Sequence, residues 1–116
     1  MSEIGIWYVP VANREEAQKI SKTLLSEKMA ACVNVLNSVE SFYMWEGEIS
    51  SSQESILIIK SSLKLANKLK NRIKELHSYN IPAIIQLPIS SINEEYQAWI
   101  LKNCLQLKEK SQLDQK

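Results

Sequence analysis

Hydrophobic and polar positions alternate along one unusually long stretch of the chain, residues 30–60. Such period-two alternation is typical of β-strands. One face of the first arm is expected to carry Val33, Val35, Val39, Ser41, Tyr43 and Trp45, and the other face Leu36, Phe42 and Met44. Glu46 and Gly47 supply the turn, because glycine readily takes the positive φ of a tight hairpin turn. The apolar run 56–59 belongs to the return arm, so the stretch predicts one long β-hairpin.

This hairpin is too long for the domain that carries it. A strand from Val33 to Trp45 would span roughly 40 Å at about 3.3 Å per residue. A domain of this length has a radius of gyration of only about 13 Å, so the tip is expected to project. Each aromatic ring at the tip gains from burying about 150–250 Å². Because an uncovered apolar hairpin aggregates, we expect another copy of the chain to cover it.

Shorter elements with their own signals surround the hairpin. Helical spacing of apolar residues alternates with short apolar runs, and asparagine or serine caps precede the helices. The expected elements are a strand over 4–9 closed by Pro10, a helix from Asn13 to about 28, the hairpin, a helix after Ser61-Ser62, a loop over 77–82, a strand from Ala83 to 87 or 89, and a third helix opened by Ser91–Glu94. The third helix is expected to turn Tyr96, Trp99 and Ile100 inward, with Cys104 or Leu107.

The element order β-α-β-β-α-β-α predicts the fold class. A split βαβ pair gives an antiparallel four-stranded sheet with both of its helices on one face. The chain is therefore expected to be an α+β protein, a ferredoxin-like βαββαβ sandwich with a long hairpin and an added C-terminal helix. A single domain is expected over residues 1–107, and the polar tail 108–116 is expected to fray.

Composition and charge exclude several classes of protein. Hydrophobic residues make up 45% of the chain and the net charge is +1, which predicts a folded domain without a nucleic-acid footprint. No apolar run approaches the roughly 20 residues of a membrane span, and the N-terminus does not look like a signal peptide. Cys32 and Cys104 are too few to staple a secreted domain, so a reducing, cytoplasmic location is expected.

His77 and Cys32 are the candidate metal ligands. His77 is the only histidine, and imidazole is both the commonest metal ligand and a proton carrier near neutral pH. The alternative is that it simply ends a helix. A Cys32 thiolate would favour Cu(I) if it met His77, and the alternative is a small buried hydrophobe. A metal site needs about four ligands, so three copies of the chain would have to converge.

Glu54 and Lys60 are candidates for a cleft between subunits. They lie six residues apart on one arm of the hairpin and therefore share a face. With Tyr43 and Trp45 they would line such a cleft, and the alternative is an interchain salt bridge. No nucleophile motif and no phosphate-binding glycine loop is present, so we do not expect an enzyme.

Several short motifs follow one another along the chain. They are Ala30-Ala-Cys32-Val-Asn34, Tyr43-x-Trp45-x-Gly47-x-Ile49, Glu54 with Ile58-x-Lys60, His77-x-Tyr79-x-x-Pro82, Leu87-Pro88-Ile89 and Tyr96-x-x-Trp99. Their order and spacing resemble the CutA divalent-cation tolerance family over residues 4–102. The resemblance implies a ferredoxin-like fold and a tight homotrimer in which long hairpins pair between subunits, much as in PII signalling proteins. It also adds Tyr79 and Tyr96 to the candidates for the intersubunit cleft.

The resemblance implies a non-enzymatic homotrimer linked to tolerance of copper and other divalent cations. No cofactor is required, and metal binding, where it occurs, is weak. Three positions depart from the family loop His-Pro-Tyr-Glu-x-Pro-Glu, namely Ser78, Asn80 and Ala83. These departures favour the alternative of a PII-like signalling or adaptor trimer that binds a protein partner or small ligand. A third, weaker hypothesis is an enzyme with His77 as general base.

Overall fold

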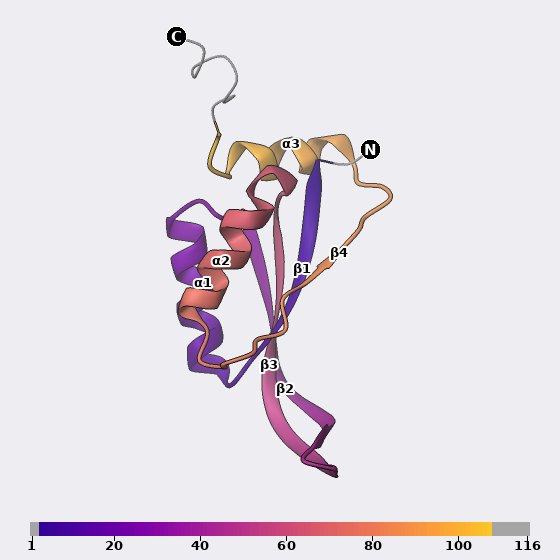
Figure 1. Ribbon diagram of the computed structural model, residues 1–116. Helices are drawn as coiled ribbons and strands as arrows, with labels where there is room; N and C mark the ends of the chain where they lie inside the picture. The colour runs from indigo at the N-terminus through magenta and orange to yellow at the C-terminus, as the bar shows by residue number, and fades with distance from the viewer. Residues whose placement is uncertain (1–2, 108–116) are drawn as a thin grey trace.

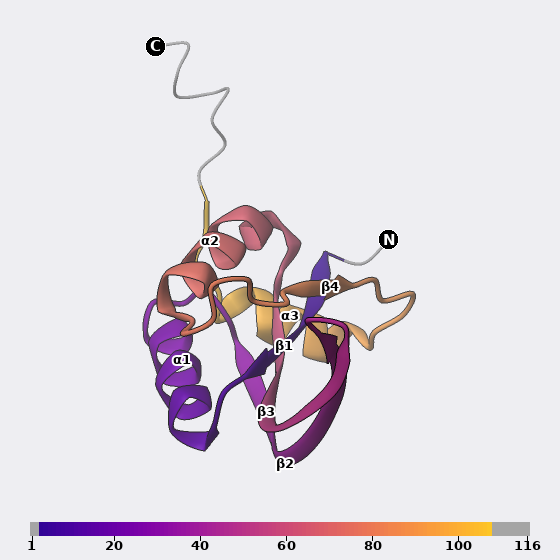
Figure 2. The same ribbon diagram turned by 60° about the horizontal axis from the view of Figure 1, so that its bottom comes forward.

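The computed structural model describes residues 3–107 and contains one antiparallel sheet flanked by helices (Figure 1). In chain order the elements are β1 (Ile4–Val11), α1 (Arg14–Ser26), β2 (Cys32–Trp45), β3 (Glu48–Ser62), a 3-10 turn η1 (Leu63–Leu65), α2 (Ala66–Leu76), β4 (Ile85–Leu87) and α3 (Glu94–Lys102). The strand order is β2-β3-β1-β4, with α1 and α2 side by side on one face (Figure 2). The ferredoxin-like α+β prediction is confirmed, and the predicted tail 108–116 lies outside the described residues.

The main core lies between the sheet and the two helices α1 and α2. Asn13 caps α1 by accepting a hydrogen bond from the Glu16 N–H at 2.8 Å, while Glu16 accepts one from the Ala12 N–H at 3.0 Å. Asn13 therefore caps the helix as predicted. A capping box would have Glu16 accept from the Asn13 N–H, but Glu16 accepts from the N–H of the preceding residue, Ala12, instead. The stripe that α1 then presents is fully buried against strand residues of β1 and β3, such as Trp7 and Leu57. Among residues 3–107, no helix has the length and apolarity that crossing a bilayer would demand.

Two strand boundaries differ from the prediction, the end of β1 and the start of β4. β1 does not close at Pro10 but continues to Val11, and Pro10 lies opposite Ile56 of β3. A proline is tolerated there because β4 pairs only with residues 6–8 of β1, so the missing N–H faces an unpaired edge. β4 is correspondingly short, starting at Ile85 rather than Ala83.

A β-bulge in β2 overturns the predicted division of the hairpin into two faces. Leu36 lies opposite Ile56, but Val39 lies opposite Glu54, so β2 has one residue more than β3 in this interval. The extra residue reverses the alternation beyond it. Val33 and Val35 face the helices, whereas Val39, Ser41, Tyr43 and Trp45 face the opposite side together with Leu36, and Phe42 and Met44 lie on the helix side.

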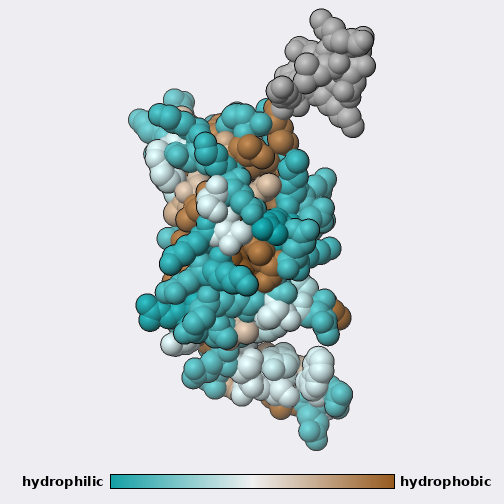
Figure 3. Space-filling view, turned by 90° about the vertical axis from the view of Figure 1, so that its left-hand side faces the viewer, coloured by the Kyte–Doolittle hydropathy of each residue, from teal (hydrophilic) through white to brown (hydrophobic). Residues whose placement is uncertain are grey.

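The hairpin projects beyond the rest of the molecule, as predicted (Figures 1 and 3). The Cα radius of gyration is 16.0 Å, above the value of about 13 Å typical of this length. Glu46 and Gly47 form the turn with positive φ values of 50° and 81°. Close to the turn, Phe42 is 68% exposed and Trp45 is 64% exposed in the single chain.

The third helix, α3, covers one end of the sheet face that α1 and α2 leave open. Ile100 packs there with Ile4 and Leu65, and Cys104, just past the helix, is buried in the same cluster. The prediction that Trp99 turns inward is wrong, since it is 46% exposed, and of the two alternatives Cys104 and Leu107 it is Cys104 that is buried. Trp99 stacks instead on the ring of Tyr96, with centroids 5.7 Å apart, and so keeps apolar contact without entering the core.

Candidate functional site

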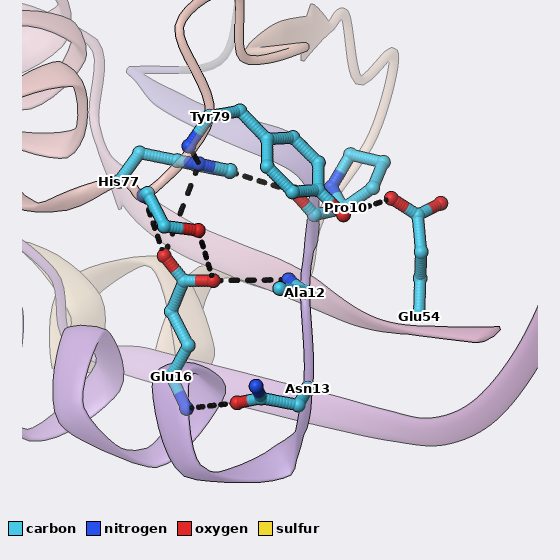
Figure 4. Close-up of polar contacts among 8 residues, drawn as sticks. Pro10, Ala12, Asn13, Glu16, Glu54, His77 and Tyr79 are labelled. Carbon is cyan, nitrogen blue, oxygen red and sulfur yellow. Dashed lines mark hydrogen bonds and ion pairs between the residues drawn. The ribbon is translucent and has the colours of Figure 1, made fainter. Parts of the chain in front are cut away.

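A polar network joins the loop after α2 to the start of α1 and to the middle of the hairpin (Figure 4). His77 ends α2 as its C-cap residue, and its side chain is fully buried. The ring lies against Tyr79, with centroids 4.7 Å apart. Because β1 extends past Pro10, its backbone passes directly beside this ring.

Hydrogen bonds occupy both ring nitrogens of His77. The Tyr79 N–H donates to Nδ1 at 3.0 Å, so Nδ1 carries no proton in this arrangement. Nε2 lies 2.8 Å from the carbonyl oxygen of Pro10, which can only accept, so Nε2 donates. The nearest Glu16 oxygen is 3.9 Å from Nδ1, too far for a hydrogen bond. In this arrangement His77 accepts through Nδ1 and donates through Nε2, so neither ring nitrogen is directed at open space.

Glu16 is a second centre of the network, and the sequence indicated it only as a helix cap. Its Oε2 accepts from the Ser78 N–H at 2.7 Å, and its Oε1 accepts from the Ser78 hydroxyl at 2.9 Å and from the Ala12 N–H. Burial opposes ionisation of this carboxyl, but the hydrogen bonds outweigh it and hold the Glu16 pKa below its usual value. The carboxylate thereby fastens the loop after α2 to the beginning of α1.

Glu54 connects the same loop to the hairpin. The Tyr79 hydroxyl donates to its Oε2 at 2.7 Å, and the Ser41 hydroxyl donates to its Oε1 at 2.6 Å. Burial, followed by the hydrogen bond and charge of Glu54, raises the pKa of Tyr79 well above its usual range. Tyr79 is therefore a fixed proton donor and not a base. Ser41 reaches Glu54 only because the bulge turns it to this face.

Lys60 and Tyr96 form a separate pair at the α3 end of the sheet. Lys60 Nζ donates to the Tyr96 oxygen at 3.3 Å and lies 5.4 Å from the ring centroid. Glu54 and Lys60 share a face of β3, as predicted, but they contact different partners. The six cleft candidates thus occupy three places: Glu54 with Tyr79, Lys60 with Tyr96, and the exposed Tyr43 and Trp45 near the tip.

The structure does not bring Cys32 to His77 within one chain. Cys32 is half-buried at the start of β2 opposite Lys60, whereas His77 contacts Pro10, which lies opposite Ile56. Four residues of β3 separate these positions, roughly 13 Å along a strand. Among residues 3–107, no three His, Cys, Asp or Glu side chains gather as a metal site would require. Metal ligation by His77 and Cys32 remains a prediction about the assembled protein.

Comparisons with known proteins agree on one family. The family described as CutA1 divalent ion tolerance protein matches residues 5–103. The Thermus thermophilus divalent-cation tolerance protein CutA is 41% identical over 103 residues, covering 89% of this chain and 98% of that protein. The crystal structure of CutA1 from Oryza sativa superposes with a TM-score of 0.88 at 35% identity, covering 91% of this chain and 97% of the other.

A plant relative is longer than this chain. The chloroplastic protein CutA of Arabidopsis thaliana is 42% identical over 96 residues, which are 83% of this chain but 52% of that protein. Its name assigns that relative to the chloroplast.

Proposed function

Because the chain belongs to the CutA1 divalent ion tolerance family, we propose that it serves divalent-cation tolerance as a non-enzymatic homotrimer. The relatives are named for tolerance and not for a reaction. The proposal is carried by the apolar surface that a single chain leaves uncovered on the hairpin and on the open sheet face. Its exposed members are Leu36, Phe42, Tyr43, Met44, Trp45, Ile49, Ile85 and Leu87.

Backbone pairing supports self-association independently of side chains. β1 runs alongside β3 only as far as the pair Val11 and Ser55, so the outer half of the hairpin is a two-stranded ribbon. Such a ribbon is marginally stable on its own in water. The short outer strand β4 also leaves an edge that can accept another strand. Hairpins of neighbouring subunits would pair with the two-stranded ribbon and with the free edge of β4.

A complementation assay tests the tolerance role. Expression in a bacterium that lacks its own tolerance protein should restore growth in raised copper or zinc. Trp45→Asp should fail to restore it, because it places an unpaired charge in the subunit contact. Lys68→Asp, an exposed charge change on α2, serves as the matched control and should restore growth. Equal rescue by Trp45→Asp and the control would contradict an assembly-dependent function.

Weak binding of copper or another divalent cation at subunit junctions is the metal component of the proposal. His77 can act as a ligand only if its ring gives up one of its two hydrogen bonds, which predicts low affinity. Calorimetric titration of the wild-type protein with Cu(I), Cu(II) and Zn(II), alongside His77→Ala and Cys32→Ser, tests this. Binding that both variants retain unchanged would remove these residues from the site.

An adaptor trimer that binds a protein partner is the second candidate. It is favoured because both ring nitrogens of His77 are already hydrogen-bonded. In addition, the N–H and the hydroxyl of Ser78 both donate hydrogen bonds to Glu16. These contacts make the loop a rigid surface feature instead of an open ligand set. Affinity capture with the tagged protein at near-physiological salt should then return a stoichiometric partner, and repeated recovery of the protein alone would count against it.

A cytoplasmic location completes the proposal. Cys32 and Cys104 are both free thiols, which suits a reducing compartment. Fractionation of the source cells tests this, and recovery of the protein outside the cytoplasm would contradict it.

A further inference from the structure

A small apolar cavity lies between α3 and the sheet, apart from the His77 network. Its volume is about 190 Å³. The apolar walls come from β1, from the segment between β4 and α3, and from α3 itself, and consist of Ile4, Ile6, Ile89, Ile92 and Ile100. For comparison, an apolar cavity of about 150 Å³ in another protein is large enough to bind benzene. The space therefore fits a compact hydrocarbon group.

Three polar residues also line the cavity, namely Lys60, Ser91 and Tyr96, and Lys60 is the charged one. Lys60 is half-buried, and its ammonium has three donors, of which one goes to the Tyr96 oxygen. Within residues 3–107, no carboxylate lies at ion-pair distance from Lys60. Tyr96 accepts from Lys60, so its own O–H remains available to donate. A half-buried cation without a counter-ion and a phenol O–H thus meet beside an apolar space.

We propose that this cavity binds a small organic monocarboxylate with an aromatic or branched aliphatic body. The apolar body would lie among the isoleucines, and the carboxylate would accept from Lys60 and Tyr96. One ammonium neutralises one negative charge, which matches a carboxylate better than a phosphate dianion that calls for several cationic donors. All of the lining residues come from one chain, at the α3 end of the open sheet face, and the proposal goes beyond the proposed role in cation tolerance.

Isoleucine methyl NMR on the assembled full-length protein tests the proposal, with benzoate as the probe. Benzoate should shift the methyl signals of Ile6, Ile89 and Ile92 with a dissociation constant on the order of 1 mM or tighter. Ile20 and Ile73, buried beneath the other sheet face, should not move. Benzyl alcohol, which lacks the charge, and acetate, which lacks the body, should each bind more weakly by roughly tenfold or more.

Two lysine variants distinguish a direct contact between Lys60 and the carboxylate from an effect of the protein's net charge. Lys60→Met should weaken benzoate binding by roughly 10- to 100-fold, while leaving the Ile20 and Ile73 signals in place as evidence of folding. Lys64→Met removes the same charge at an exposed position of η1 and should leave binding unchanged. If benzoate does not shift the methyl signals of the cavity isoleucines in the wild-type assembly, the proposal is overturned. That result is expected if a neighbouring subunit fills the space. Equal affinity of Lys60→Met and Lys64→Met for benzoate would also overturn it.

Discussion

At the scale of single residues, the buried polar side chains of this protein hold one loop, the segment that follows α2, in place. Ser78 stands where the resemblance to the family implies a proline, and its N–H and hydroxyl both donate to Glu16. Proline has no N–H to donate. The departure therefore exchanges a stiff backbone for two hydrogen bonds that hold the loop to the start of α1.

Glu16 should make stability depend on pH. Its folded pKa lies below the ordinary value of 4.5, so its contribution is present above that value and is lost as pH falls through the folded pKa. Glu16→Gln should lower the free energy of unfolding by about 1–2 kcal/mol at neutral pH and by less near pH 3. Urea unfolding at both pH values measures this difference. Glu15→Gln, at an exposed position, is the control. If the loss in free energy of unfolding caused by Glu16→Gln does not vary with pH, the account is contradicted.

Tyr79→Phe removes the hydroxyl that donates to Glu54. We expect a loss of about 1–2 kcal/mol in the free energy of unfolding, because Ser41 is then the only hydrogen-bond partner of Glu54 among residues 3–107. Tyr8→Phe deletes a hydroxyl for which no hydrogen bond is found among residues 3–107, so it should cost less. Chemical denaturation of both variants checks this, and equal costs would show that the Tyr79–Glu54 contact contributes nothing.

At the scale of elements, periodicity predicted the sheet, its helices and the hairpin, because buried positions recur at fixed intervals. It failed where one extra residue enters a strand. No glycine or proline marks the bulge, and Ser38 adopts a φ of 61° without the residue type that usually indicates it. The side on which Tyr43 and Trp45 lie could not be read from the sequence for this reason.

The candidate site was predicted less well than the fold. His77, Tyr79 and Glu54 were found from short motifs, but their connection was not, since it depends on the length of β1 and on the bulge. Ser41 gave no signal as a polar-site residue because serine in a hairpin is normally read as solvated surface. Which residues far apart in the sequence become hydrogen-bond partners depends on the register of the paired strands. The hydrophobic pattern alone does not determine that register.

The two glycines should respond differently to alanine. At Gly47 a Cβ would meet nothing within 4 Å, so Gly47→Ala should cost only the strain of φ +81°, about 1–2 kcal/mol. At Gly5 a Cβ would lie 2.7 Å from the Trp7 ring and 2.8 Å from Leu63, so Gly5→Ala should disturb the core. Thermal unfolding, with NMR of the Trp7 indole N–H, separates them: the Trp7 signal should shift in Gly5→Ala and stay in place in Gly47→Ala. A Trp7 signal that shifts only in Gly47→Ala would reverse this assignment.

At the scale of the whole molecule, the shape of the chain points to a partner identical to itself. The extents of 56 × 33 × 25 Å reflect a hairpin that its own domain does not cover. The exposed residues near the tip are the kind that subunit interfaces bury. Glu46 lies in the turn and Glu48 directly after it, and their charges would keep the free tip from pairing indiscriminately.

Trp45→Asp should dissociate or precipitate the assembly, because the variant would bury a charge without a partner. Light scattering coupled to size-exclusion chromatography measures the mass, with Lys68→Asp as the folded charge-change control. An unchanged assembly mass for Trp45→Asp would mean that the hairpin tip lies outside the interface.

Sedimentation equilibrium of the wild-type protein at micromolar concentration tests self-association most directly. One chain has a mass of 13.3 kDa. The account predicts a single species of about 40 kDa, as expected for a closed three-fold assembly, which does not dissociate on tenfold dilution. A well-behaved species of 13.3 kDa would contradict it.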